Sequence, residues 1–250
     1  MTYCVGLHLR DGLVLLSDTR TNAGVDNISI FGKMQVEEIA GDRVLAVLSA
    51  GNLAITQAVW NRLQEGVSLG NEVLTLRTVT SMFRAAQLVG QAVREVFAAD
   101  GPTLKAQGVG FDISLLLGGQ IASGPPRLFL VYAAGNFIEA TADTPFLQIG
   151  EHKYGKPILD RALEHGTSLE DGVKLVLVSM DSTLRSNLTV GLPIDLLVYR
   201  ADTLSVGLRR RITEEDAYFR GVRERWSAAL REAYLRLPPP DWLAEASGPG

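Results

Sequence analysis

The chain has 250 residues, 46% of them hydrophobic, which suffices for the core of one large domain or two small ones. Its formal net charge is −4, and the cluster Arg209-Arg210-Arg211 is short and followed by acidic residues, so it predicts a solvated turn rather than a nucleic-acid-binding stripe. No apolar run approaches the roughly 18 residues of a membrane span, no signal-peptide layout opens the chain, and its single cysteine excludes an internal disulfide. We therefore expect a cytoplasmic protein that binds neither nucleic acid nor membrane.

The first twenty residues predict a β-hairpin. Apolar residues alternate over 3–10, as in a half-buried strand, and 13–17 is almost entirely apolar, as in a central strand. Asp11-Gly12 is a two-residue turn signal between the two arms. A hairpin folded there brings Asp18 close to Thr2, and a start pinned in a sheet is not frayed.

The remaining segments predict two blocks of strands, each followed by helices. A Gly-rich loop is expected over 100–111, and Thr167-x-x-Glu170 indicates a capping box. Two such blocks predict an α+β protein, a four-layer αββα sandwich with two antiparallel sheets stacked face to face. The expected order is strands at 3–10, 13–20, 34–39 and 43–50, helices at 52–65 and 76–99, strands at 112–119, 127–133 and 137–141, helices after Gly155 and Thr167, a strand at 194–200 and a helix at 213–237.

The chain is expected to divide into a main domain, 1–211, and a C-terminal helix and tail, 212–250. Thr213 is the expected helix cap, and the segment 241–243 after three prolines is a further apolar anchor. Two alternatives remain for the helix: its apolar stripe packs on its own domain or reaches a neighbouring subunit. The stripe comprises Tyr218, Phe219, Val222, Trp226, Leu230, Tyr234 and Leu237.

Thr2, Asp18 and Lys33 are the candidate catalytic residues. Removal of Met1 would leave Thr2 with both a hydroxyl and a free α-amine. A hydroxyl is a poor nucleophile that needs a base, and an α-amine with a pKa of about 8 can accept its proton near neutral pH. Taken alone, Thr2 is more simply an ordinary terminal residue. The hairpin, with Asp18 and Lys33 following, favours the catalytic interpretation.

Over residues 2–200 the chain resembles the proteasome β-subunit and HslV family of N-terminal nucleophile hydrolases. Within that family the segments NISIFGKM and SNLTVGLPIDLL and the C-terminal extension are most similar to the bacterial Anbu branch. The resemblance implies a threonine-type peptidase or amidase without a cofactor. The matching pieces are Thr2, Val5-Gly6, Asp11-Gly12, Asp18-Thr19-Arg20, Gly24, Lys33, Leu48-Ser49-Ala50-Gly51, Gly150 and residues 193–198.

The resemblance also implies roles for individual residues. Thr2 would be the nucleophile and its amine the base, Lys33 would lower the amine pKa, and Asp18 would orient Lys33. Arg20 would support the surroundings of Asp18, and the Gly51 N–H would stabilise the oxyanion. The pocket positions Thr21, Ile30, Ser49 and Leu53 are uncharged, which predicts a preference for uncharged apolar groups.

The sequence departs from the family pattern around the threonine amine. Glu151 stands where the family has a serine after the glycine, and it is either a solvated loop carboxylate or a functional group that points into the pocket. Asn187 and Val190 replace an aspartate and a serine, and Ser186 and Thr189 lie close by in the sequence. These departures weaken the expectation of ordinary proteasome-like peptidase activity more than that of the fold.

Three functions remain open from the sequence: an amide-cleaving threonine hydrolase, a scaffold subunit with the same fold, and a biosynthetic amidase. The family implies a homo-oligomeric ring or ring-like assembly of at least six subunits, and the sequence leaves open whether an ATPase partner is needed. Cys4 is a buried strand residue rather than a thiol nucleophile. His152 and His165 lack ligands at metal-binding spacing, so no metal site is expected.

Overall fold

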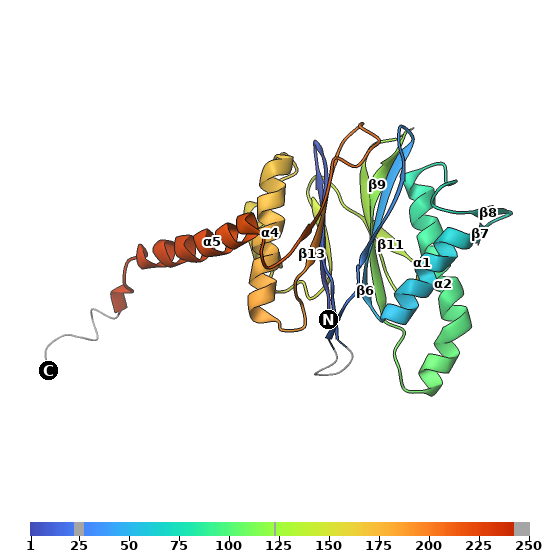
Figure 1. Ribbon diagram of the computed structural model, residues 1–250, viewed down its shortest axis with the longest axis horizontal. Coiled ribbons are helices and arrows are strands. Elements are labelled where there is room, and N and C mark those ends of the chain that lie inside the picture. Colours follow the sequence, from blue (N-terminus) through green and yellow to red (C-terminus); the bar gives the residue numbers. More distant parts are fainter. Residues whose placement is uncertain (23–27, 123, 243–250) are drawn as a thin grey trace, which may run out of the picture.

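The computed structural model describes residues 1–22, 28–122 and 124–242, so Gly24 and Leu243 lie outside the described part of the chain. Two five-stranded antiparallel sheets face each other between outer helices (Figure 1). This confirms the predicted α+β four-layer sandwich. The first sheet has the order β12-β1-β2-β13-β14 and the second β11-β10-β9-β6-β5.

The bounds of the elements are as follows. The first sheet contains β1 (Tyr3–Leu9), β2 (Gly12–Asp18), β12 (Phe146–Gly150), β13 (Ile194–Arg200) and β14 (Leu208–Ile212). The second contains β5 (Met34–Ile39), β6 (Arg43–Gly51), β9 (Ile113–Ile121), β10 (Arg127–Val131) and β11 (Phe137–Glu139). Small hairpins are formed by β3 (Arg20–Asn22) with β4 (Ile28–Ile30), and by β7 (Val67–Leu69) with β8 (Glu72–Leu74). The helices are α1 (Leu53–Glu65), α2 (Met82–Ala106), α3 (Lys156–Ala162), α4 (Leu169–Ser186) and α5 (Ala217–Leu235).

Three apolar layers hold the sandwich together. One lies between the sheets and includes Cys4, Leu15 and Leu116, and the outer two join each sheet to its helices. Strand β1 is therefore buried on both faces, not half-buried as its alternation predicts. Its even positions contact the second sheet and its odd positions contact the helices, so the period of two separates two cores rather than core from solvent.

The first hairpin is shifted by one residue from the predicted turn. Leu9 pairs with Gly12, so Arg10 and Asp11 form the turn and Gly12 begins β2. Asp18 still lies close to Thr2 as predicted, because the backbone N–H of the next residue, Tyr3, donates to Asp18 Oδ1 at 3.1 Å.

Helix α2 continues where a loop is predicted. It begins at Met82, with Ser81 as its cap, and extends through Pro102 to Ala106. Gly101 is buried, and a Cβ there would lie 2.9 Å from the Phe97 ring. Pro102 has no backbone N–H, so the helix loses one hydrogen-bond donor at this point. The helix nevertheless continues to Ala106, and the loop predicted from Gly101-Pro102 is wrong.

Two helix caps also differ from prediction. The cap of α4 is Ser168 rather than Thr167, since Ser168 Oγ accepts from the Asp171 N–H at 3.1 Å. The cap of α5 is Asp216 rather than Thr213, since Asp216 Oδ1 accepts from the Phe219 N–H at 2.9 Å. In both cases the residue directly before the helix accepts a hydrogen bond from a backbone N–H of the first turn that has no partner within the helix.

The arginine cluster forms an edge strand instead of a turn. Arg211 lies opposite Asp195 in the β13–β14 pair, and its Nε and Nη2 donate to the two carboxylate oxygens at 2.7 and 2.8 Å. A cross-strand ion pair of this kind stabilises a charged edge strand. The expected boundary at residue 211 falls inside β14, and the division into two parts stays a prediction.

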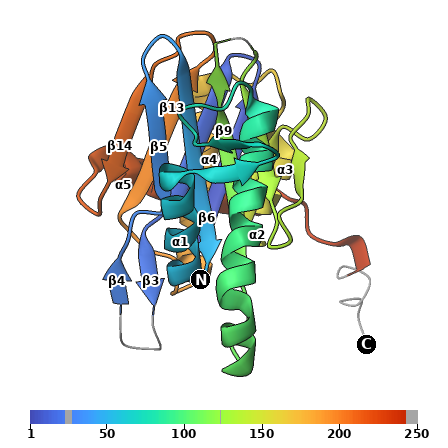
Figure 2. The same ribbon diagram turned by 90° about the vertical axis from the view of Figure 1, so that its right-hand side faces the viewer.

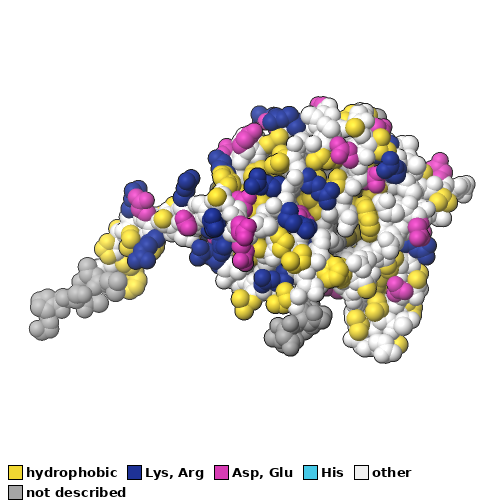
Figure 3. All heavy atoms as spheres, in the orientation of Figure 1, with side chains coloured by type: hydrophobic (Ala, Val, Ile, Leu, Met, Phe, Trp, Pro, Cys, Tyr) yellow, Lys and Arg dark blue, Asp and Glu magenta, His cyan; other side chains and the backbone are white. Residues whose placement is uncertain are grey.

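Helix α5 contacts the body of the protein along its first half, as far as Trp226, whose indole nitrogen is buried. Phe219 is 1% exposed, and Arg223 Nε donates to Asp181 Oδ1 on α4 at 2.7 Å. Beyond this point the helix projects away from the sandwich (Figure 1), and apolar side chains gather at its far end (Figure 3). There Leu230, Tyr234 and Leu237 are 50%, 57% and 71% exposed, so the apolar stripe packs on its own domain only in part.

Within the described residues, no helix combines the length and the hydropathy needed to cross a bilayer.

Candidate active site

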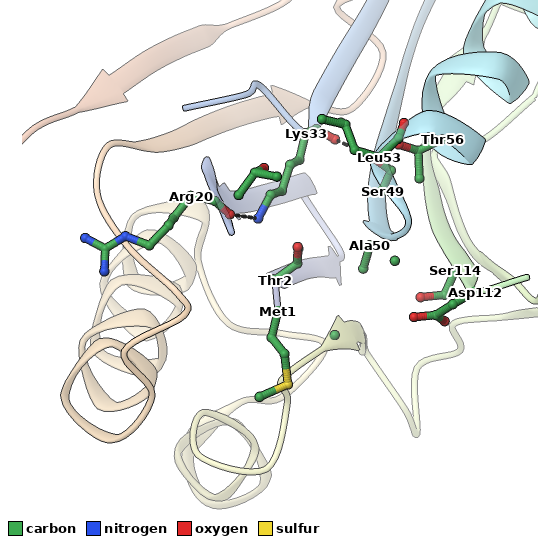
Figure 4. Close-up of a pocket in the computed structure, with 13 residues that line it drawn as sticks. Met1, Thr2, Arg20, Lys33, Ser49, Ala50, Leu53, Thr56, Asp112 and Ser114 are labelled. Carbon is green, nitrogen blue, oxygen red and sulfur yellow. Dashed lines mark hydrogen bonds between the residues drawn. The ribbon is translucent and has the colours of Figure 1, made fainter. Parts of the chain in front are cut away.

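A cavity of about 500 Å³ opens where the chain start meets the ends of both sheets (Figure 4). The β3–β4 hairpin, α1 and the N-terminus lie at this same end of the molecule (Figure 2). Strands β1, β3, β6, β9 and β12 all contribute residues at or beside their ends. Of the residues singled out from the sequence, the cavity is lined by Thr2, Arg20, Thr21, Lys33, Ser49, Gly51, Leu53 and Gly150.

The centre of the site is a buried ion pair. Lys33 Nζ lies 2.7 Å from Asp18 Oδ1, and the two residues are 6% and 0% exposed. Asp18 also accepts hydrogen bonds from the N–H groups of Tyr3, Arg20 and Gly191, at 3.1, 3.2 and 3.4 Å. Burial raises the pKa of the Asp18 carboxyl, while Lys33 and these backbone donors act against that effect.

Arg20 contributes its backbone to this pair rather than its charge. Its carbonyl oxygen accepts from Lys33 Nζ at 2.6 Å, while its guanidinium points away from the cavity (Figure 4) and donates to the Leu188 carbonyl at 2.8 Å. Lys33 Nζ is thus held between two oxygen acceptors, beside the Thr2 hydroxyl that points toward it (Figure 4).

Gly51 ends β6 with its N–H directed toward the cavity. The Ser49 N–H donates to the Lys33 carbonyl at 3.0 Å, and the Asn52 N–H donates to the Asp112 carbonyl on the opposite side at 2.8 Å. Because N–H groups alternate sides along a strand, the Gly51 N–H points to the Lys33 side, beyond the start of β5. Only glycine fits here: its φ is +113°, and a Cβ would lie 2.3 Å from the Asp112 carbonyl.

The chain start is pinned by β12, which sequence reasoning missed. Tyr3 pairs with Gly150, and the Glu151 N–H donates to the Thr2 carbonyl at 2.6 Å. Gly150 has φ +79°, and a Cβ there would lie 2.0 Å from the Thr2 carbonyl, so the two backbones touch. Thr2 is therefore 7% exposed and held in place.

Met1 lines the cavity in front of Thr2. Burial lowers the pKa of the Met1 amine, and the Lys33 charge acts in the same direction, whereas Asp18 and Glu151 act against it. Three ionisable side chains therefore influence the chain end, one of them cationic and two anionic.

Five predicted site residues lie outside the cavity lining, of which Asp18 is buried behind Lys33 as its ion-pair partner. Ile30 is 59% exposed on the outer strand of the β3–β4 hairpin, and Ser186 is exposed at the end of α4. Glu151 does not line the cavity; it is 7% exposed, and its Oε2 accepts from Asn187 Nδ2 at 2.9 Å. It is therefore neither a pocket-lining nor a solvated carboxylate. Asn187 Oδ1 in turn accepts from the N–H and hydroxyl of Thr189, at 2.9 and 2.6 Å.

The cavity also contains residues that the sequence did not single out. Asp112 and Ser114 come from the start of β9, because Gly51 pairs with Ile113 and Ala50 with Ser114. Asp112 places a carboxylate at the cavity beside the uncharged Thr21, Ser49 and Leu53, and the preference for uncharged apolar groups stays a prediction. The sequence does show two polar residues, Asp112 and Ser114, at the start of an apolar strand. That they lie at the cavity follows only from the pairing of β9 with β6, which the sequence does not reveal.

A second cavity of about 280 Å³ adjoins the first behind α1. It shares Ser49, Leu53 and Thr56 with the first cavity. Its other polar side chains, among the residues that the structure describes, include the amides of Gln35, Gln57 and Asn61.

Cys4 and the histidines do not enter the site. Cys4 is fully buried, its Sγ contacts the Ser49 carbonyl at 3.7 Å, and burial raises the pKa of its thiol. His8 and His165 lie against each other, with ring centroids 5.3 Å apart. The described residues contain no group of three or more side chains able to hold a metal ion.

Two antiparallel sheets between helices, with a threonine at the start of a central strand beside a buried Lys–Asp pair, define the fold of the N-terminal nucleophile hydrolases. Solved structures agree. Anbu (Gly-1) mutant from Hyphomicrobium sp. strain MC1 has 51% identity and a TM-score of 0.89, over 96% of this chain and 100% of that one. Anbu (ancestral beta-subunit) from Yersinia bercovieri has 48% identity and a TM-score of 0.88, over 96% and 98%. The chain belongs to the Anbu family, which confirms the resemblance to that branch.

A further similar structure is described as the helical assembly of the Anbu complex from Pseudomonas aeruginosa. It has 51% identity to this chain and a TM-score of 0.88, over 95% of this chain and 98% of that one. No family model matched the sequence, and no curated protein did.

Proposed function

We propose that the protein is a threonine-type hydrolase that cleaves amide bonds, in peptides or smaller amides, once removal of Met1 exposes the Thr2 amine. The observation that carries this proposal is the meeting of Thr2, the Lys33–Asp18 pair and the Gly51 N–H at one cavity. With Met1 in place, the Thr2 nitrogen is an amide and cannot act as a base.

The reaction begins with attack of Thr2 Oγ on the amide carbonyl carbon, as the Thr2 amine takes up the hydroxyl proton. The substrate oxygen gains negative charge, which the Gly51 N–H stabilises. The carbon–nitrogen bond breaks, the ammonium returns its proton to the leaving amine, and an ester on Thr2 remains. Water then hydrolyses the ester and restores the hydroxyl.

The Lys33–Asp18 pair prepares the amine for this role. A cation near an amine disfavours its protonated form, so Lys33 keeps more of the base neutral near pH 7. Asp18 and the Arg20 carbonyl hold Lys33 Nζ in one position, and a fixed charge acts without reorganisation during the reaction.

Covalent labelling tests this proposal. A β-lactone should add once per chain, on Thr2, after Met1 has been lost, because the activated hydroxyl opens the lactone to form an ester. Iodoacetamide should leave this labelling unchanged, since the Cys4 thiol is buried. Intact mass and peptide mapping report both modifications and the presence of Met1. Inactivation by iodoacetamide with no lactone adduct would reverse the assignment.

A scaffold function is the second candidate. The observation that favours it is the replacement of the expected serine and aspartate beside the threonine amine by Glu151 and Asn187. A scaffold would keep Met1 and accept no lactone on Thr2, so the same labelling experiment separates the two functions.

We further propose that the chain self-associates into an assembly of at least six subunits. An exposed apolar face of this kind marks an interaction surface in soluble proteins, and the far end of α5 presents one. The Pseudomonas aeruginosa Anbu, described as a helical assembly, supports the same conclusion.

Light scattering should therefore report a particle of at least six chains of 27.0 kDa at micromolar concentration. The double variant Leu230→Glu/Tyr234→Glu should give smaller particles, because it puts charge on the exposed face without touching the packed start of α5. A matched change on the opposite surface, Glu72→Gln, should have no effect. A stable wild-type monomer would contradict the proposal.

A further inference from the structure

Asp112 lies on the wall of the active-site cavity, next to the strand that carries the Gly51 N–H. Gly51 pairs with Ile113, and the Asn52 N–H donates to the Asp112 carbonyl at 2.8 Å. Neighbouring strands lie about 5 Å apart, so the backbone of Asp112 is one strand spacing from the group proposed to bind the substrate oxygen. The Asp112 carboxylate therefore lies within reach of a substrate residue close to the cleaved bond.

Ser114 lies beside Asp112 on the same wall. The two residues are two positions apart where β9 begins, so their side chains point to the same side of the strand. Figure 4 shows both side chains directed into the cavity, apart from Ser49, Leu53 and Thr56. A carboxylate and a hydroxyl side by side offer several oxygen acceptors, a set that suits an ammonium or a guanidinium group.

The cationic side chains at this cavity, among the residues that the structure describes, are engaged elsewhere. Lys33 Nζ donates to Asp18 Oδ1 at 2.7 Å and to the Arg20 carbonyl at 2.6 Å. The Arg20 guanidinium points away from the cavity and donates to the Leu188 carbonyl (Figure 4). The charge of Asp112 therefore faces the cavity without a counter-charge from the described side chains of the lining.

We propose that Asp112 determines substrate specificity by binding a cationic group of the substrate, an inference that rests on the proposed function. The group is an ammonium or a guanidinium, carried by a basic side chain or by a free α-amine. It belongs to a different residue from the uncharged one predicted to lie against Thr21, Ser49 and Leu53, since Asp112 occupies another part of the wall. Because Asp112 is exposed to solvent, the preference is modest and weakens with salt.

Peptide binding to the assembled Thr2→Ala variant without Met1 tests the proposal independently of any chemistry. The probes are pairs of dye-labelled peptide amides that differ only in lysine against norleucine, an apolar residue without the ammonium. The exchange is made in turn at the residue before and at the residue after a fixed leucine, and a third pair compares a free with an acetylated α-amine. Fluorescence anisotropy should show about fivefold tighter binding of the cationic member in at least one pair. The pair that shows it identifies the source of the cation.

Variants at Asp112 test whether its charge causes the preference. Asp112→Asn should remove it by weakening the binding of the cationic peptide to the level of the neutral one, whereas Asp112→Glu should keep part of it and Asp112→Lys should reverse it. Glu72→Gln, an exposed carboxylate paired with Arg84, is the matched control and should keep the full preference. Equal binding of both members of every pair, or a preference that survives in Asp112→Asn, would overturn the proposal.

Failure of the two proposals can be told apart. Absence of β-lactone addition from the wild-type protein would refute the hydrolase, while anisotropy would still report whether Asp112 binds a cation. Normal lactone addition without a cation preference in any pair would refute the role of Asp112 alone.

Discussion

Thr2→Ala should abolish both amide hydrolysis and β-lactone addition, because no other hydroxyl or thiol in the described site can replace Thr2 Oγ next to an amine. The fold and assembly should persist, with a change in unfolding free energy of about 1 kcal/mol or less, since only a hydroxyl and a methyl group facing the cavity are lost. Intact mass, turnover of a cleaved amide, light scattering and thermal melting measure these effects.

Thr2→Ser is the matched control for this variant. It keeps a hydroxyl at the same atom and should retain lactone addition. Wild-type turnover in Thr2→Ala would exclude Thr2 as the nucleophile, whatever the labelling shows.

Lys33→Ala should lower lactone addition at pH 7 by about 100-fold or more, because the amine loses the cation that keeps it neutral. Part of the rate should return at alkaline pH, where the amine deprotonates without help. The variant should also lose about 3 to 5 kcal/mol of stability, since Asp18 is left buried without its partner. Urea unfolding and a pH series of lactone addition measure the two effects separately.

The double variant Asp18→Asn/Lys33→Met separates stability from activity. Replacing both members of a buried ion pair by neutral groups of similar size often restores stability. We expect it to unfold near the wild-type urea concentration and to remain unreactive toward the lactone. Wild-type reactivity in this variant would show that the pair is structural only.

The fold was predictable where local signals agree with one another. Alternation over 3–10, an apolar run over 13–17 and a turn between them were enough to place Asp18 beside Thr2, even though the turn is Arg10-Asp11. The stacking of two sheets followed from the order of strands and helices. These inferences depend on neighbours in sequence, which the sequence displays directly.

The unpredicted features depend on contacts between distant segments. Strand β12 completes the sheet only because Tyr3 meets Gly150, and Asp112 reaches the cavity only because β6 pairs with β9. Ile30 stays outside because it lies on the outer strand of a small hairpin. The continuation of α2 through 101–102 is a local exception, since Gly101 contacts Phe97 within one turn of the same helix. No local pattern records the pairing of β1 with β12 or of β6 with β9.

The bonds around Asp18 determine when, during synthesis, the site can form. The β2–β3 corner is tied to a late part of the chain: Gly191 N–H to Asp18, Thr19 Oγ1 to the Pro193 carbonyl at 2.6 Å, and Arg20 to the Leu188 carbonyl. A nascent chain still short of residue 193 has translated Thr2, Asp18 and Lys33 but lacks these bonds to the β2–β3 corner. The site proposed for Thr2 can therefore be completed only after nearly the whole sandwich has been translated.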